Sequence, residues 1–382
     1  MHVVQISFFV DPERRSPETL LDEWRSLAEI ADSVASTGAQ VTVIQASMVP
    51  RQVQRSGVTF HFIAPERAGA RLTSSAAFQS LLRDLAPDVI HVHGLAFPRE
   101  VCELRDLVPN VPTLLQDHAD RVPYFWRRSG WRRGAAAAAG VSFCSRAQAG
   151  PFQRAGLLAP EMPIFEIPEA TSLFTPGDKK EARSATGMHG SPAVLWVAHL
   201  DANKDPLTVL NAVSVAARSL PELQLWCCYI SAPLLSAVQS RIKRDARLRD
   251  RVHLLGCVPH EQIEELMRAA DCFVLASHRE GGNFSLIEAL ATGLTPIVTD
   301  IPSSRALTGD GTVGTLWPCG NWRALARELQ TTAVEQRADT RSHVRAYYEA
   351  QLSSTAIGQK LISAYNQLIE TRRPASTALA VS

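Results

Sequence analysis

The stretch from residue 271 to residue 300 constrains the fold of this 382-residue chain more than any other. Its apolar run at 272–276 has the length and the polar borders of a buried strand, and a polar turn with two glycines follows. Apolar residues then recur at helical spacing up to a glycine, and a second strand covers 294–298. A strand, a helix and a second strand in this order form one unit of a parallel sheet. Ligands of such sheets bind at the carboxyl ends of the strands, where Glu280 lies.

The start of the predicted helix suits a phosphate group. Asn283 or Ser285 can cap it, and its first backbone amides have no partner within the helix, so this end attracts anions. Glu288 lies about five residues further on, or roughly 7.5 Å along the axis. A sugar nucleotide fits this layout, with its phosphates on the amides, its sugar near Glu280 and its ribose near Glu288, since an ionised carboxylate accepts from paired hydroxyls. The alternative is a capped surface helix with two solvated acids.

The two acids belong to a longer pattern. Glu280 precedes Gly281, seven residues separate Glu280 from Glu288, and residues 288–293 read Glu-Ala-x-Ala-x-Gly, with Pro296 shortly after. In its strand–turn–helix context this pattern resembles the signature of the retaining GT-B glycosyltransferases of family 4, the glycosyl transferases group 1. The resemblance implies an α/β protein with the GT-B fold, in which two doubly wound Rossmann-like domains face each other across a cleft.

The resemblance also implies a function. Such a protein would be a metal-independent hexosyltransferase that moves a sugar from a nucleotide-sugar donor to an acceptor with retention of configuration. The donor is a co-substrate, and no cofactor is expected. The implied donor-binding residues in this part of the chain are Glu280, Gly281, Gly282, Asn283, Phe284, Ser285 and Glu288.

A second donor-binding segment follows the predicted strand at 193–198. The family has Gly-Arg-x4-Lys there, and this chain has Ala198 and His199 in place of Gly and Arg but keeps Lys204. A lysine at a strand end can neutralise the phosphates and the leaving group, although a solvated loop lysine is the alternative. His199 is a weaker clamp than arginine because it is charged only when protonated. Val258 lies in a segment that resembles the family's backbone contact to the nucleobase.

His118 ends a predicted strand and resembles the family's histidine near the donor sugar. Asp117 and Asp120 flank it and raise the fraction of imidazolium. We expect His118 to hydrogen-bond the donor sugar or the acceptor, and we expect the catalytic set His118, Lys204 and Glu280. His91 and His93 point to one face of a strand, but no third ligand lies at a useful spacing, so no metal site is predicted.

Two basic segments of the first half have open roles. The loop after the first strand, residues 9–17, lacks the glycines that the family commonly has there, and its Arg14 and Arg15 could bind an anion or be solvated. The segment 121–133 is the densest in arginine and aromatic residues, and it could hold an anionic acceptor or a membrane surface. Its candidate residues are Arg127, Arg128, Trp131 and Arg132. The alternative is an ordinary loop and helix with buried aromatics and solvated arginines.

Length and alternation of strands and helices predict two domains. We expect an acceptor-side domain at 1–170, a linker at 171–190, a donor-binding domain at 191–352, a C-terminal helix at 353–373 that crosses back to the first domain as in the family, and a disordered tail at 374–382.

Composition excludes several classes of protein. The net charge is +1, so there is no overall bias toward nucleic acid or membrane, and the seven scattered cysteines have no metal-binding spacing. Reduced cysteines, a first strand in place of a signal peptide and the lack of a spanning apolar run predict a cytoplasmic protein. A peripheral contact with the inner membrane face stays open.

The sequence therefore predicts a retaining glycosyltransferase whose acceptor, a lipid, a glycan or a small molecule, is not identified. No second carboxylate is clearly placed as a nucleophile, which favours a same-face mechanism assisted by the leaving phosphate. Two alternatives stay open, namely a nucleotide-sugar epimerase or hydrolase on the same fold, and a non-catalytic homologue that binds nucleotide sugars.

Overall fold

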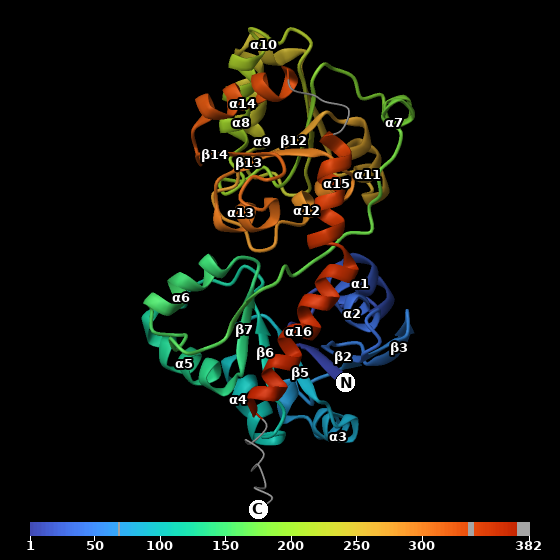
Figure 1. Ribbon diagram of the computed structural model, residues 1–382, viewed down its shortest axis with the longest axis vertical. Helices are drawn as coiled ribbons and strands as arrows, with labels where there is room; N and C mark the ends of the chain where they lie inside the picture. Colours follow the sequence, from blue (N-terminus) through green and yellow to red (C-terminus); the bar gives the residue numbers. More distant parts are fainter. Residues whose placement is uncertain (68, 335–339, 373–382) are drawn as a thin grey trace, which may run out of the picture. The chain divides into compact units, whose positions relative to one another are not determined.

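A computed structural model describes residues 1–67, 69–334 and 340–372. The chain forms two compact units, the first made of Met1–Ala170 with the segment from Ser354 onward, and the second of Thr171–Ser353 (Figure 1). The tail predicted at 374–382 lies outside the described residues.

The first unit is built on one eight-stranded sheet with the order β3-β4-β2-β1-β5-β6-β7-β8. Its strands run parallel to their neighbours except β3, which pairs with β4 in the antiparallel direction. The strands are β1 (His2–Ser7), β2 (Gln40–Ala46), β3 (Arg51–Arg55), β4 (Val58–Ile63), β5 (Val89–His93), β6 (Thr113–Gln116), β7 (Gly140–Phe143) and β8 (Ile164–Glu166). Chain order reverses at β1, between β2 and β5, and such a switch point is where open α/β sheets bind ligands.

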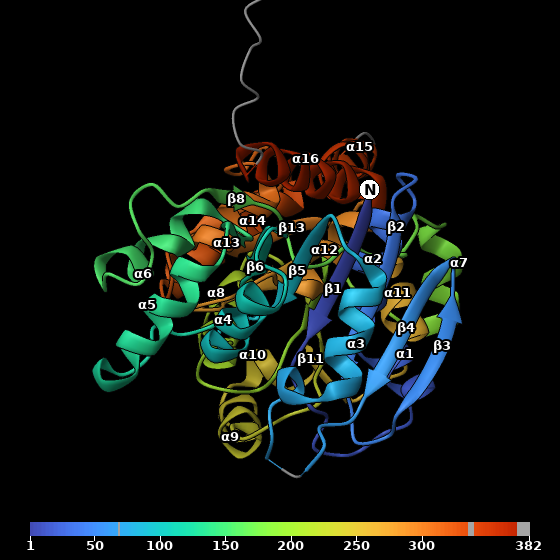
Figure 2. The same ribbon diagram turned by 90° about the horizontal axis from the view of Figure 1, so that it is seen from below.

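Helices cover both faces of this sheet, as the two views show (Figures 1 and 2). They are α1 (Pro17–Glu23), α2 (Arg25–Ala35), η1 (Leu72–Ser74), α3 (Ala76–Leu85), α4 (Pro98–Leu107), η2 (Phe125–Arg127), α5 (Arg128–Ala137), η3 (Arg146–Ala149), α6 (Gly150–Arg154) and α16 (Ser354–Arg372). One core cluster holds alternate strand residues such as Val4 and Ile6, and the other holds their neighbour Val3 with residues of α2 and α16. Because strand side chains alternate between faces, one strand supplies both cores.

The first helical segment of the chain is divided into two helices, α1 and α2. Ser16 caps α1 through the amide of Thr19, and the helix ends at Trp24, whose backbone leaves the helical region. The ring of Trp24 lies 5.5 Å from that of Phe9, and the Arg15 guanidinium lies 5.4 Å from its centroid. These contacts hold Trp24 at a break between α1 and α2, although the apolar spacing runs through both helices.

The second unit is a six-stranded parallel sheet with the order β11-β10-β9-β12-β13-β14. Its strands are β9 (Ala193–Val197), β10 (Gln224–Cys228), β11 (Val252–Gly256), β12 (Cys272–Leu275), β13 (Thr295–Thr299) and β14 (Thr315–Trp317). Its helices are α7 (Lys179–Thr186), α8 (Pro206–Ala216), α9 (Leu235–Arg244), α10 (Ala246–Arg249), α11 (His260–Ala269), α12 (Phe284–Ala291), α13 (Pro302–Thr308), α14 (Trp322–Val334) and α15 (Thr340–Gln351). Chain order reverses between β9 and β12, which makes this the switch point of the second sheet.

The segment at 171–190, predicted as a linker, contains a helix. Asp178 caps α7 by accepting hydrogen bonds from the amides of Lys180 and Glu181, and Gly187 ends the helix in the left-handed region. The helix buries Ala182 and packs against α11. The polar composition that suggested a linker belongs to the exposed face of a short surface helix.

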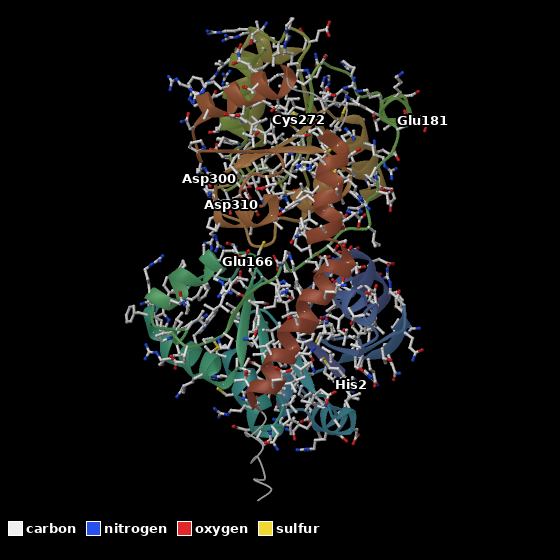
Figure 3. All side chains as sticks on the ribbon, viewed as in Figure 1. His2, Glu166, Glu181, Cys272, Asp300 and Asp310 are labelled. Atoms are coloured by element: carbon white, nitrogen blue, oxygen red, sulfur yellow. The ribbon has the colours of Figure 1, made fainter. Side chains whose placement is uncertain are left out.

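The cysteines are unpaired. Cys272, labelled in Figure 3, is buried at the start of β12, and burial raises the pKa of the Cys228 thiol to about 12. Buried, protonated thiols behave as small apolar side chains. Cys257 and Cys319 are exposed instead.

Candidate functional site

Two loops meet at the switch point of the second sheet. One follows β9 and leads to α8, and the other follows β12 and leads to α12. The amide of His278 donates to the carbonyl of Asn203 over 2.8 Å, and the Asn203 side-chain amide donates to the carbonyl of Arg279 over 2.9 Å. These two bonds tie the loops together, so the residues that follow in each loop are held at fixed positions.

Lys204 and Glu280, one from each loop, form an ion pair. Both side chains are mostly buried, with 18% and 10% of their surface exposed. The backbone of Lys204 is fixed as well, because its amide donates to the carboxylate of Asp201 over 2.9 Å. A partly buried charge needs a partner, and here each of these two supplies it to the other.

The start of α12 leaves its first amides open. Asn283 occupies the N-cap position with a φ of 43°, and its side chain makes no cap hydrogen bond to the described residues. The hydroxyl of Ser285 donates over 3.4 Å to Oδ1 of Asn283, which occupies the predicted cap position without the predicted side-chain cap bond. Its Nδ2 is buried and finds no partner among the described residues. Buried Gly281 and Gly282 precede it, so main-chain donors dominate this helix end, as in anion sites.

Glu288 has a partner that the sequence did not suggest. Its Oε1 lies 2.6 Å from Nε2 of His260, the first residue of α11. The His260 ring in turn lies 4.5 Å from the ring of Phe174. Val258 comes two residues earlier in the same loop and is partly buried. The ordered carboxylate of Glu288 is thus positioned beside the segment expected to contact a nucleobase.

His199 lies at the exposed end of the β9 loop. The amide of Ser231 donates to its Nδ1 over 3.3 Å. Nδ1 is the acceptor in this contact, so Nε2 is the ring nitrogen left to donate a hydrogen bond. His199 thus offers an N–H donor at the position where the family has an arginine.

In the first unit, His118 lies after β6 and uses both ring nitrogens. Nδ1 lies 2.5 Å from a carboxylate oxygen of Glu169, and Nε2 lies 3.1 Å from Nδ1 of His93. Burial lowers the pKa of His118, but the hydrogen bond and charge of Glu169, with the charges of Asp120 and Asp117, outweigh burial and raise it. As an imidazolium, His118 donates to both neighbours. A ligand therefore contacts the main chain of His118, or it must displace Glu169 or His93 from the ring.

His91 and His93 form a buried polar layer beneath His118. Their rings stack with centroids 4.6 Å apart, and Nδ1 of His91 lies 2.7 Å from the hydroxyl of Tyr365 on α16. Burial lowers the pKa of His91 to about 3 and holds that of His93 well below its ordinary value. Both rings are neutral and serve as hydrogen-bonding core residues. Within the described residues, no group of three potential ligands could hold a metal.

The turn after β6 also carries a buried acid, Asp117. Burial raises its pKa to about 7, and the charges of Asp120 and Glu169 add to this effect. The amide of Asp120 donates to Asp117 over 3.0 Å, and the amide of Leu95 donates to Asp120 over 2.7 Å. The turn is therefore ordered by its own acids.

A pocket of about 600 Å³ opens at the switch point of the first sheet. Its walls include the aromatic rings of Phe9, Trp24 and Phe97, and its polar groups come from the ends of β1, β2, β5 and β6 and from α2. The lining residues are Ser7, Phe9, Trp24, Ser26, Leu27, Gln45, His93, Gly94, Ala96, Phe97, His118 and Asp120. Among these described residues there is no lysine or arginine.

Arg15, offered by the sequence as an anion-binding residue, is used within the loop. Its guanidinium bonds the buried carboxylate of Asp11 over 2.8 Å and also pairs with Glu23. The hydrogen bond from Arg15 holds the pKa of Asp11 well below its usual range. Arg15 therefore stabilises the glycine-free loop.

The arginine-rich segment forms η2 and α5. Trp131 packs against Phe152, with centroids 6.3 Å apart, and contributes to the core. Arg127 and Arg132 are exposed, and Arg128 is partly buried. Trp131 is partly buried, and the more exposed rings lie earlier, at 124–126.

Two family models match this chain. The model described as Glycosyl transferases group 1 matches residues 178–349, and the one described as Glycosyltransferase Family 4 matches residues 24–162. A GDP-mannose:cellobiosyl-diphosphopolyprenol alpha-mannosyltransferase of Xanthomonas campestris is 23% identical over 297 residues, which are 75% of this chain and 76% of that relative.

Solved structures share the fold across nearly the whole chain. The sucrose-phosphate synthase of Thermosynechococcus elongatus has a TM-score of 0.71 at 19% identity and covers 97% of this chain and 99% of its own. The Anabaena protein HepE, solved in complex with UDP, has a TM-score of 0.70 at 16% identity and covers 96% of this chain and 100% of its own.

Proposed function

The chain belongs to family 4 of the retaining GT-B glycosyltransferases, and from that premise we propose that its second unit holds the nucleotide-sugar donor between Lys204, Glu280, Glu288 and the start of α12. The protein transfers a sugar from such a donor. The observation that carries the binding mode is the Lys204–Glu280 ion pair at the sheet's switch point, beside an uncapped helix end.

Donor binding would exchange the partners of this ion pair. The diphosphate takes the ammonium group of Lys204, and the released carboxylate of Glu280 accepts hydrogen bonds from sugar hydroxyls. The amides of Phe284 and Ser285 bind phosphate oxygens, and Glu288 accepts from the ribose hydroxyls while His260 holds its other side. Each charge thereby keeps a partner before and after binding, which avoids the cost of a buried lone charge.

The transfer itself would follow a same-face course. The bond between the anomeric carbon and the phosphate oxygen breaks, a bond to the acceptor oxygen forms on the same face, and the acceptor's proton passes to the departing phosphate. Lys204 and the α12 amides stabilise the charge that develops on the diphosphate, with the Nε2–H of His199 as a further donor. With the charge neutralised by these groups, the reaction needs no metal.

We propose the pocket of the first unit as the acceptor site. It has aromatic walls, and the charge of His118 is balanced by Glu169. An uncharged sugar suits such a surface better than a phosphorylated one. The named acceptor of the Xanthomonas relative is a lipid-linked sugar, which supports the same class here, together with a peripheral membrane contact through Arg127, Arg128 and Arg132.

Two experiments test the proposal. In a thermal-shift screen of nucleotide sugars, a donor at about 100 times its dissociation constant should add roughly 2.7 kcal/mol of stability. Product analysis with and without acceptor then separates transfer from hydrolysis or epimerisation. A native protein that responds to no nucleotide sugar would contradict the proposal, and binding without turnover would favour the non-catalytic alternative.

A further inference from the structure

Three consecutive aromatic side chains project from the first unit at η2. Tyr124, Phe125 and Trp126 are 70%, 75% and 62% exposed. The rings of Tyr124 and Trp126 stack with centroids 4.7 Å apart, and Phe125 meets Trp126 edge-on at 5.0 Å. The three rings thus form one apolar cluster in contact with solvent. Large exposed apolar patches mark interaction sites.

Unneutralised positive charge surrounds this cluster. Residues 121–160 contain seven arginines and no aspartate or glutamate, a formal charge of 7 − 0 = +7 in a chain whose net charge is +1. Among the described residues, none of these seven forms a salt bridge. Some exposed arginines elsewhere in the same unit are paired, such as Arg51 with Glu18 and Arg105 with Asp106. The positive field at η2 and α5 is therefore available to a partner.

The helix beneath the cluster is firmly held. Gly134 of α5 lies so close to Pro98 of α4 that a Cβ atom there would come within 2.5 Å of its Cα, and Trp131 packs on Phe152. Both views show α5 next to α6 on the side of the first unit away from α1 and α3 (Figures 1 and 2). The arginines and aromatics thus project from a fixed platform.

We propose that this aromatic–arginine surface, defined as Tyr124, Phe125 and Trp126 with Arg127, Arg128, Arg132 and Arg133, docks on an anionic lipid bilayer. Tyrosine and tryptophan favour the boundary between headgroups and acyl chains, and arginine binds lipid phosphates through paired N–H groups. Arginines alone would suit any polyanion, but three solvent-exposed rings gain free energy only where they leave water. The combination therefore favours a bilayer.

The position of this surface connects it with the acceptor pocket. Asp120 lines the pocket, and Tyr124 follows four residues later, a chain length of at most about 14 Å. A lipid-linked sugar could thus have its sugar in the pocket and its lipid in the bilayer. In the described part of the chain no helix is long and apolar enough to cross a membrane, so docking would be peripheral. This inference deepens the membrane contact in the proposed function and rests on it for the acceptor.

The test is co-sedimentation with vesicles of phosphatidylcholine alone and of phosphatidylcholine with phosphatidylglycerol. The native protein should bind the anionic vesicles, and less so as salt rises, because exposed charges are screened over about 8 Å at physiological ionic strength. The variant R127Q/R128Q/R132Q/R133Q should bind roughly 10³-fold more weakly, since each of the four basic residues near the surface contributes about 1 kcal/mol. The variant Y124S/F125S/W126S should lose the part of the binding that survives high salt.

Two matched controls accompany these variants. R51Q/R55Q/R71Q/R105Q removes four arginines that are paired with acids, and L173S/I230S removes two exposed apolar side chains of the second unit. Both controls should bind vesicles like the native protein. Nucleoside diphosphate affinity, measured on every sample, should stay unchanged.

Three results would overturn the inference. The first is a native protein that ignores anionic vesicles at low salt, and the second is loss of binding in the controls as large as in the surface variants. The third is a native dimer in analytical ultracentrifugation that the aromatic variant converts to monomer, which would make this surface an interface between two copies. Loss of vesicle binding with intact nucleotide affinity leaves the proposed donor site standing, so the two failures are distinguishable.

Discussion

The carboxylate of Glu169 lies 2.5 Å from Nδ1 of His118, and this contact fixes the charge of the histidine beside the acceptor pocket. Glu169 is 6% exposed on its side chain, so the pair is largely shielded from water. His93 accepts from the other ring nitrogen, and its own Nε2 lies 3.3 Å from the side-chain oxygen of Gln5. A chain of polar groups thus runs from Glu169 into the core of the first unit.

Replacing Glu169 by Gln should destabilise the folded protein by an amount that depends on pH. The folded pKa of His118 is raised above its ordinary value of about 6.5, so the pair contributes stability that is full below pH 6.5 and is lost as pH rises through the folded pKa. Glu169→Gln should cost about 1.5–3 kcal/mol below pH 6.5 and less at higher pH, as measured by urea unfolding. Exposed Glu161→Gln is the control, and a cost that does not vary with pH would contradict the account.

Asp117 is an acid and His118 is a base, but both should make the folded state less stable as pH rises. Its pKa is raised to about 7 from 3.8, so the folded protein keeps a proton that the unfolded chain releases between these values. Stability from this group is therefore full below pH 3.8 and is lost as pH rises to about 7. Asp117→Asn should gain stability relative to the native protein above pH 7, by up to a few kcal/mol. Equal pH profiles of the two proteins in thermal unfolding would refute the shift.

Lys204→Ala should lower turnover more than donor binding. The charge of Lys204 matters most as the diphosphate leaves, so we expect a loss on the order of 10²-fold or more in kcat. Exposed Lys243→Ala in α9 is the matched control and should leave kcat unchanged. A variant whose KM rises while kcat stays intact would show that Lys204 only binds.

The contact between α16 and α2 should depend on the absence of a side chain at Gly358. A Cβ atom at this position would collide with the carbonyl group of Ser33. Gly358→Ala should therefore destabilise the first unit by about 1–3 kcal/mol, as overpacking does. Gly130→Ala is the control within α5, where a Cβ meets nothing within 4 Å, and it should be stabilising by about 0.5–1 kcal/mol. If both variants unfold like the native protein in urea, the close packing of α16 is wrong.

Patterns among neighbouring residues were sufficient to predict the strand–helix–strand unit that forms part of the candidate donor site. The stretch at 271–300 has a buried strand, a glycine turn and a short apolar helix, and these became β12, α12 and β13 because each signal lies within a few neighbouring residues. The GT-B fold and the family expected from the two acids are confirmed by the two parallel sheets and by the comparisons. The site roles of Lys204, Glu280 and Glu288 stay predictions.

The missed residues act through contacts between distant parts of the chain. Glu169 lies in a loop and His260 is the first residue of α11, and no local spacing indicates that one meets His118 and the other Glu288. The break at Trp24 has the same origin, since it depends on Phe9 and Arg15. The sequence places His260 at the start of α11, two residues after Val258, and this position was the available indication that it lies near the donor site.

The most direct test of the donor site is calorimetry with a nucleoside diphosphate and with its 2′,3′-dideoxy analogue. Native protein should bind the complete ligand more tightly, and Glu288→Ala should lose about 1.5–3 kcal/mol for that ligand. The analogue lacks both ribose hydroxyls, so it should bind the native protein and Glu288→Ala equally. Equal affinities of native protein and Glu288→Ala for the complete ligand, with the variant folded, would contradict a donor site built around Glu288.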